Sequence, residues 1–545
     1  MAEIIRKKKN SSIVMQTIKL LKIQLLQYLE VNEVFYSKDK KRKHNLYFIF
    51  GIYIFLAAML AFYMGGGAFG LCMLGMPDVV PAYVLSVTSI VILVFTVFKA
   101  GSMLFQVKNY EMLISLPISP AAIVVSRFLN MYIGNLVLSV LAMLPAGIIY
   151  GIYAGKGIPF YMMFVTSIFL VPLVPLTIAS MLGAGITAVA ARMKHKNAVT
   201  IVASLVLMTG IILLSFYPAL GAGEITKKQM ADFSTMIEQQ INGMYPLAGL
   251  YTEAMVKGNI AAFAGFAAIS AGIFFVFTGG VQWKYASICA ALITHTARKN
   301  YVLGKQYRRS PVKAMYIKEL KRYFASSIYV MNTAVGYIMM ILLALTLLLV
   351  GTDKMQASMG IGEMAKEIAE KMLPFALGAM GMMGTTTISS ISIEGKQWWI
   401  PNSLPVSTKV IVDSKIFVNL TLAVPSCLVV AALSIAALGY QGMKSVWIFV
   451  IPLMYCMFAS VLGVAVNIKF PKFRWDNEAA VVKQGAALLV GMLLEFLSAI
   501  LGVSLVFALG NSSYHLAMAA VMVILFAAAA VIYKKIIKFD LRKLE

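Results

Sequence analysis

Long apolar stretches recur along the chain at nearly regular intervals. A helix that crosses a bilayer needs about 20 mostly apolar residues, and twelve segments meet that requirement. They are residues 46–64, 79–98, 128–151, 160–190, 198–216, 259–280, 329–350, 372–392, 416–438, 446–467, 485–507 and 514–533. The pattern predicts an all-α polytopic membrane protein with about 12 transmembrane helices.

The fourth segment is unusually long and contains Pro172 and Pro175. Proline removes a helix hydrogen bond and clashes with the preceding turn. We therefore expect a kink in this span, with neighbouring helices satisfying the freed carbonyls.

Lys and Arg residues predict the orientation of the chain. If the N-terminus is inside, outer loops carry 8 of the 47 basic residues, and the other 39 fall on the inner side. Cytoplasmic loops carry such an excess, so both termini are expected in the cytoplasm. Contact of these loops with anionic inner-leaflet lipid accounts for the net charge of +25 without nucleic acid.

A duplicated motif divides the chain. Residues 115–119 read SLPIS, and residues 403–407 read SLPVS, at an offset of 288. The same offset matches Ile123 with Ile411, Ser126 with Ser414 and Arg127 with Lys415. An even number of spans in each half predicts two parallel six-helix repeats.

The repeat suggests five regions. A basic, amphipathic cytoplasmic segment (1–45) precedes the first six-helix half (46–280). A cytoplasmic linker with an amphipathic helix (281–328) leads to the second half (329–533) and a cytoplasmic tail (534–545). Within the first and third regions, residues 18–29 and 313–324 have the pattern of helices that lie in the membrane interface.

The residue types in the duplicated loops predict their backbone geometry. We call residues 115–119 the first elbow and residues 403–407 the second elbow. A residue before proline is pushed out of helical conformation, so Leu116 and Leu404 should be extended. Ser119 and Ser407 are suitable N-caps for the helix that follows. The elbow residues are Ser115, Leu116, Pro117, Ile118 and Ser119, and Ser403, Leu404, Pro405, Val406 and Ser407. The alternative to a functional elbow is an ordinary tight turn between spans.

These elbows, the amphipathic helix before each half, and the stretches 317–333 and 467–484 resemble permeases of the ABC-2 type. The chain is similar to a group of large permeases of Gram-positive bacteria in which two six-span halves are fused, and which are regarded as ABC exporters. The resemblance covers nearly the whole chain through short motifs. It implies a multi-pass protein of the bacterial plasma membrane.

The resemblance also implies a division of labour. A separate cytoplasmic ABC ATPase, expected in two copies, would bind ATP and Mg²⁺, and the elbows would couple it to the permease. The loops 191–197 and 468–484 would make a second contact, and these two loops differ from each other. The chain itself has no GxxxxGK[ST] phosphate loop, so neither a cofactor nor ATP hydrolysis is expected in it.

Other candidate chemistry is sparse. HExxH, GxSxG, paired carboxylates and Cys/His sets are absent from the sequence, so we expect no enzyme activity and no metal site. Glu495 lies within the eleventh span. An ionisable group there is expensive and usually faces the bundle or a wet cavity, so it is either a functional residue or a structural acid held by a neighbouring helix.

Two other functions remain open. A twelve-helix secondary transporter driven by an ion gradient shares the helix count and the parallel repeat, although its usual Gly-rich motif between spans two and three is replaced here by SLPIS. A non-transporting membrane module for signalling or assembly is the second alternative. The apolar interior favours export of a hydrophobic or amphipathic substrate, which the sequence does not identify.

Overall fold

The computed structural model describes most of the chain, and what it describes is helical. It describes residues 13–28, 40–73, 75–104, 115–116, 118–191, 246–294, 308–350, 363–475, 478–482, 485–509 and 514–544, together with parts of 199–210. Helices make up most of these residues, and none of them lies in a strand. The prediction of an all-α fold is confirmed for this part of the chain.

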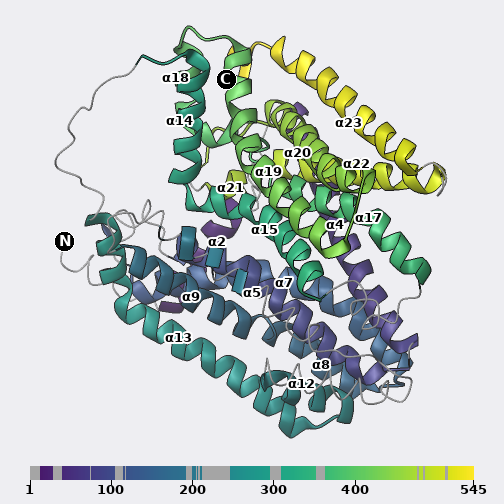
Figure 1. Cartoon of the computed structure of the whole chain (residues 1–545). Coiled ribbons are helices and arrows are strands. Elements are labelled where there is room, and N and C mark those ends of the chain that lie inside the picture. The colour runs from purple at the N-terminus through teal and green to yellow at the C-terminus, as the bar shows by residue number, and fades with distance from the viewer. Residues whose placement is uncertain are drawn as a thin grey trace. The chain divides into compact units, whose positions relative to one another are not determined.

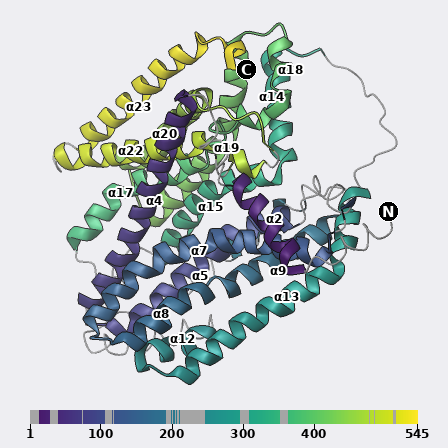
Figure 2. The ribbon, with the colours of Figure 1, turned by 180° about the vertical axis from the view of Figure 1, so that it is seen from behind.

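The helices gather into two compact units (Figures 1 and 2). The first unit comprises residues 1–200 and 226–301, and the second comprises residues 201–225 and 302–545. The helices of the first are α2 (Ile13–Tyr28), α4 (Lys40–Met73), the short η1 (Pro77–Val79), α5 (Val80–Leu104), α7 (Pro120–Tyr153), α8 (Ile158–Leu170), α9 (Leu173–Ala191), α12 (Pro246–Lys257) and α13 (Ile260–Thr294).

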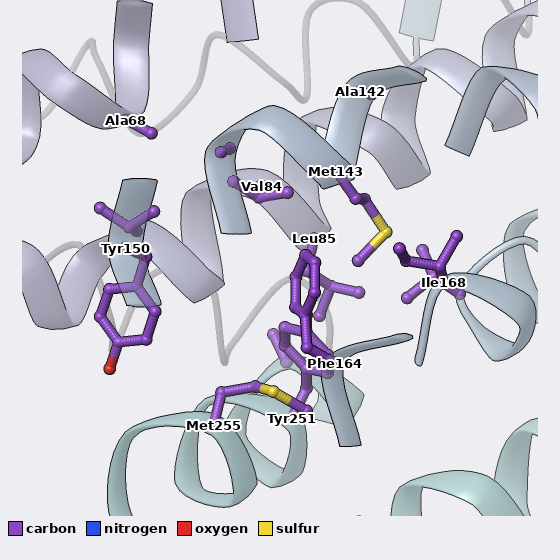
Figure 3. Packing of buried hydrophobic residues seen from close by; sticks show 14 of the residues in the cluster. Ala68, Val84, Leu85, Ala142, Met143, Tyr150, Phe164, Ile168, Tyr251 and Met255 are labelled. Carbon is purple, nitrogen blue, oxygen red and sulfur yellow. The ribbon is translucent and has the colours of Figure 1, made fainter. Parts of the chain in front are cut away.

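A core of aromatic and aliphatic side chains joins α4, α5, α7, α8 and α12 (Figure 3). Tyr150 on α7 and Tyr251 on α12 are almost fully buried in it. Ala68 on α4 and Ala142 on α7 belong to the same core. In lipid the hydrophobic effect does not drive helices together, so their association depends on van der Waals packing. Small residues strengthen this packing because they let the helices approach closely.

The predicted kink in the fourth apolar segment is confirmed. α8 ends at Leu170, a turn follows at Val171 and Pro172, and α9 begins at Leu173. Helical hydrogen bonding resumes after the turn, where the Leu176 N–H donates to the Pro172 carbonyl four residues earlier at 3.1 Å. The proline therefore divides one apolar segment into two helices.

The second unit holds the remaining elements that the structure describes in full. They are α14 (Pro311–Ala325), α15 (Ser327–Val350), α17 (Glu363–Met383), η3 (Ser392–Gln397), α18 (Trp399–Ser403), α19 (Thr408–Leu438), α20 (Met443–Lys469), α21 (Ala479–Val482), α22 (Ala486–Leu509), α23 (Tyr514–Ile537) and η5 (Leu541–Leu544). α19 packs against α14, α15 and α20, and α22 packs against α17, α20 and α23.

One expected span is interrupted. Residues 372–392 were expected to form a continuous helix, but α17 ends at Met383 and residues 384–391 follow mainly as turns. Five of these eight residues are Thr or Ser, whose hydroxyls form local hydrogen bonds that compete with the helix. The side chains from Thr385 to Ile391 are nonetheless buried. The expectation of a continuous helix was therefore wrong.

Two asparagines from neighbouring helices satisfy the backbone of this segment. Asn419 Oδ1 on α19 accepts the Thr386 N–H at 2.7 Å. Asn467 Oδ1 on α20 accepts the N–H groups of Ile391 and Ser392 at 2.8 and 3.0 Å. Non-helical backbone at membrane depth is tolerated where protein supplies its partners, and these two side chains do so here.

Ten segments of the described residues are long and apolar enough to cross a membrane, which indicates a multi-pass membrane protein. They are Phe50–Met73, Pro77–Val94, Pro120–Tyr153, Ile158–Ile186, Ile260–Val281, Ser327–Leu349, Thr408–Leu438, Met443–Lys469, Ala480–Leu509 and Tyr514–Ile537. Two expected spans are not among them: 372–392 is interrupted, and 198–216 lies largely outside the described residues. The count of twelve stays a prediction.

Gly463 on α20 lies against the interrupted segment. A Cβ at this position would lie 2.8 Å from the Ile388 nitrogen and closer still to the Thr387 hydroxyl. Gly463→Val is expected to destabilise the protein by about 1–3 kcal/mol through overpacking. The loss is measured as a lower unfolding temperature in detergent. Gly272→Val on α13, where a Cβ meets no atom within 4 Å, is the control, and equal losses in both variants would contradict the prediction.

Candidate functional site

The two elbows stand at the heads of two long helices, the first before α7 and the second before α19. Leu116 and Leu404 are 46% and 40% exposed. Ile118 and Val406 are half-buried in both places. Each elbow therefore presents a leucine outward and anchors the next apolar residue inward. Pro117 lies outside the described residues.

Both elbows make the same backbone turn. The Ile118 N–H donates to the Leu116 carbonyl at 2.7 Å, and the Val406 N–H donates to the Leu404 carbonyl at 2.8 Å. Such a three-residue turn is tight, and the proline at its centre fixes one of its torsion angles. Leu404 has φ −78° and ψ 145°, which confirms the extended backbone predicted for it.

The predicted caps differ between the halves. Ser119 Oγ accepts the Ala122 N–H at 3.2 Å, so Ser119 is the expected N-cap of α7. Ser407 has the extended backbone of an N-cap, but its side chain makes no capping hydrogen bond. Its carbonyl instead accepts the Val410 N–H at 3.0 Å. Both serines therefore occupy the predicted N-cap position, and the side-chain hydrogen bond expected of a cap forms only at Ser119.

A short helix braces the helix behind each elbow. α2 packs on α7, where Gln16 Oε1 accepts the Ser119 N–H at 3.0 Å and Gln24 Nε2 donates to Ser126 Oγ at 3.3 Å. α14 packs in the same way on α19. The regions predicted at 18–29 and 313–324 are helical over their described residues, 18–28 and 313–324, and both helices contact the helix that an elbow begins.

Five charged side chains form a network behind the second elbow, in which Lys415 and both carboxylates are buried and the other two cations are partly exposed. Lys415 Nζ on α19 lies 3.0 Å from Glu319 Oε2 and 2.9 Å from Glu394 Oε1. Glu394 Oε2 lies 3.0 Å from both Lys318 and Arg322 on α14. The side chains of Lys415 and Glu394 are 1% and 0% exposed. The network ties α14 and η3 to the first turns of α19.

The charges decide the protonation of Glu394. Burial by itself would raise the pKa of this carboxyl, but Lys415, Lys318 and Arg322 outweigh it and lower the pKa to about 2. The carboxylate is therefore ionised at neutral pH. Because breaking a buried pair leaves an uncompensated charge, the parts that the network joins are expected to move together.

The network has no counterpart of the same charge at the aligned positions of the first half. The offset of 288 aligns Glu394 with Gln106, and the offset of 295 between the bracing helices aligns Glu319 with Gln24. The positive charge of Lys415, in contrast, does have a counterpart, because Arg127 aligns with Lys415. Arg127 is buried and donates to the Leu104 carbonyl at 2.5 Å. The two elbows are thus built alike but held differently.

A cavity of about 330 Å³ adjoins the second elbow. Val406, Ser407 and Thr408 line one side, and residues 537–542 at the end of the chain line another. The tail was expected only to lie in the cytoplasm. The structure shows in addition that it helps to form the surroundings of this elbow.

Comparisons of the chain with protein-family models, with curated proteins and with solved structures each find no match. The family suggested by the sequence motifs is therefore a proposal, and the site is interpreted from its own geometry.

The predicted second contact loop, 468–484, packs against the second unit itself. Trp475 Nε1 donates to the Ser392 carbonyl at 2.9 Å, and Asn332 Nδ2 donates to the Val482 carbonyl at 2.9 Å. Ser326 at the start of α15 donates to Glu478. This loop therefore supports η3, beside the ion network. Its counterpart, 191–197, lies almost wholly outside the described residues.

Glu495 lies on α22, away from the elbows in the chain but next to the interrupted segment. Its side chain is buried and within hydrogen-bond reach of Thr385. Its Oε1 has no hydrogen-bond partner among the described residues. Those residues also contain no group of three His, Cys, Asp or Glu side chains that would hold a metal ion.

Proposed function

We propose that the chain is the membrane-spanning permease subunit of an ATP-driven ABC-2-type transporter, powered by a separate ATPase. The observation that carries the proposal is the repeated elbow. In each half an exposed leucine stands on a tight proline turn, directly before a helix of more than 30 residues. Motion imposed on such a leucine passes into the whole helix, because the turn has little freedom of its own.

The proposed cycle follows from these connections. ATP binding would draw two ATPase subunits together under the elbows, and α7 and α19 would move with them. The bracing helices α2 and α14 would move too, because each is bonded to its partner helix. Rearrangement of the two halves would then release a hydrophobic or amphipathic substrate on the outer side. Export from the bacterial cytoplasm is part of this proposal.

The experiment is purification of the tagged chain from its native membrane in mild detergent, followed by mass spectrometry. We expect an ABC ATPase to co-purify with the wild-type chain and to be lost from the variant Leu116→Asp, Leu404→Asp. The charged side chain would put an unpaired carboxylate into an apolar contact. Size-exclusion chromatography checks that the variant folds: the wild-type chain and the variant chain should each elute as one sharp peak.

A matched control places the same substitution beyond the other ends of α7 and α19, away from the elbows. Ile158 begins α8 just after α7, and Met443 begins α20 just after α19; both are exposed. Ile158→Asp, Met443→Asp should keep the ATPase. If the ATPase stays bound to the elbow variant, the elbows are not the contact. If no ATPase appears with the wild-type chain, the permease proposal fails.

One observation favours a secondary transporter instead. Glu495 is a buried carboxyl beside the turns that follow α17, and one of its oxygens has no partner among the described residues. Such groups often mark ion or proton pathways. Transport that persists without ATP, depends on an ion gradient and is abolished by Glu495→Gln would support this alternative.

A further inference from the structure

Four basic side chains surround a hollow on α14 and the residues just before it. The hollow has a volume of about 710 Å³ and is lined by Arg308, Arg309, Ala314, Ile317, Lys318 and Lys321. We propose that it binds the headgroup of an anionic phospholipid. This site is separate from the elbows and would exist whatever drives the protein.

The place of the hollow along the chain puts it at the membrane surface. α14 ends at Ala325, and the apolar span of α15 begins at Ser327. Lys321 precedes that span by six residues, or about 9 Å of helix. A lipid headgroup beside the first residues of α15 is therefore within reach of the basic side chains.

The exposed side of α14 has the chemistry of an interfacial helix. Ala314, Lys321 and Phe324 are exposed, while Met315, Glu319 and Tyr323 are buried on the other side. Phe324 is 50% exposed. Helices that lie in the interface combine basic side chains for headgroups with apolar side chains for acyl chains. A phospholipid uses both, whereas a free anion uses only the charges.

Positive charge is in excess around the hollow. Arg308, Arg309 and Lys321 form no ion pair with any described residue, since the ion pairs between described residues of the second unit join only the five network residues. With Lys318, Arg322 and Lys415 they make six cations, against the two carboxylates of the ion network, an excess of four. A phosphodiester offers oxygens that an arginine binds through two parallel hydrogen bonds, so it suits this excess.

Lys318 links the hollow to the ion network. It lines the hollow and also lies 3.0 Å from Glu394 Oε2. A bound headgroup would therefore touch the cluster that holds α14, η3 and α19 together. We expect occupancy by lipid to stabilise the second unit.

The test uses the full-length chain, purified and free of any ATPase. Vesicles of phosphatidylglycerol or of phosphatidylcholine are titrated, with retained lipid measured by native mass spectrometry and stability by the unfolding temperature. Phosphatidylglycerol should be retained and should raise the unfolding temperature; phosphatidylcholine should do neither. The variant Arg308→Gln, Arg309→Gln, Lys321→Gln should bind phosphatidylglycerol roughly tenfold or more weakly, because each basic residue near the surface adds attraction to anionic lipid.

The control variant Lys534→Gln, Lys535→Gln, Lys543→Gln removes the same charge from exposed positions at the end of the chain. Equal weakening in both variants would overturn the proposal, because general surface charge would explain the binding. So would displacement of the lipid by soluble glycerophosphate, which would show a free-anion site. Unchanged lipid binding in the hollow variant would also overturn the proposal. A protein that co-purifies from the membrane with the wild-type chain but not with this variant would then show a protein-docking surface.

Discussion

Replacing Lys415 by methionine is expected to lower the free energy of unfolding by about 3–5 kcal/mol, the cost typical of breaking a buried ion pair. The ammonium lies between the carboxylates of Glu319 and Glu394, 3.0 and 2.9 Å away. Methionine fills similar space without the charge, so the carboxylates would face each other with one cation fewer. The change is measured by denaturant unfolding in detergent.

Two further variants make this result interpretable. Lys409→Met removes an exposed lysine from the same helix and should change stability by no more than about 0.5 kcal/mol. Adding Glu394→Gln to Lys415→Met should recover part of the loss, because it removes one of the uncompensated carboxylates. If Lys415→Met behaves like Lys409→Met, the network contributes nothing to stability.

Acid is expected to weaken the protein through Glu394. The pKa of this carboxyl is about 2 in the folded chain, against an ordinary value of 4.5. A lowered pKa means that its stabilisation is complete above about pH 4.5 and is lost as the pH falls through 2. The difference corresponds to about 3 kcal/mol. Unfolding temperature measured between pH 6 and pH 2 tests this.

The matching variant is Glu394→Gln, which should be less stable at neutral pH and should lose less on acidification. Asp78→Asn, an exposed acid in the first unit, should keep the wild-type pH dependence. If wild-type and Glu394→Gln fall in parallel as the pH is lowered, another group causes the acid sensitivity.

Hydropathy predicted the presence of the helices more accurately than it predicted their first residues. The third and ninth spans were expected from residues 128 and 416, whereas α7 begins at Pro120 and α19 at Thr408. The first two turns carry Arg127 and Lys415, which an apolar window excludes. Those turns pack against the bracing helices α2 and α14, and only the tertiary structure shows this.

The elbows could be predicted from sequence because their signals are local. Proline restricts its neighbours, and serine before a helix is a common cap, so a five-residue motif was sufficient. The ion network could not be predicted, because Glu319, Glu394 and Lys415 are distant in sequence. One signal was available: a cation is kept at position 127 and at position 415, where an apolar helix begins. The interruption at 384–391 was hidden because its isoleucines keep the stretch apolar.

The shared cation also bears on the order in which the two elbows could have come to differ. Arg127 and Lys415 show that a buried positive charge is common to both, while glutamine occupies in one half the positions that glutamate occupies in the other. If the cation came first, each glutamine could become glutamate singly, since every new carboxylate would already face a positive charge. The reverse order would have placed a lone acid in the protein interior. In the cation-first order, no intermediate carries a buried acid without a cation beside it.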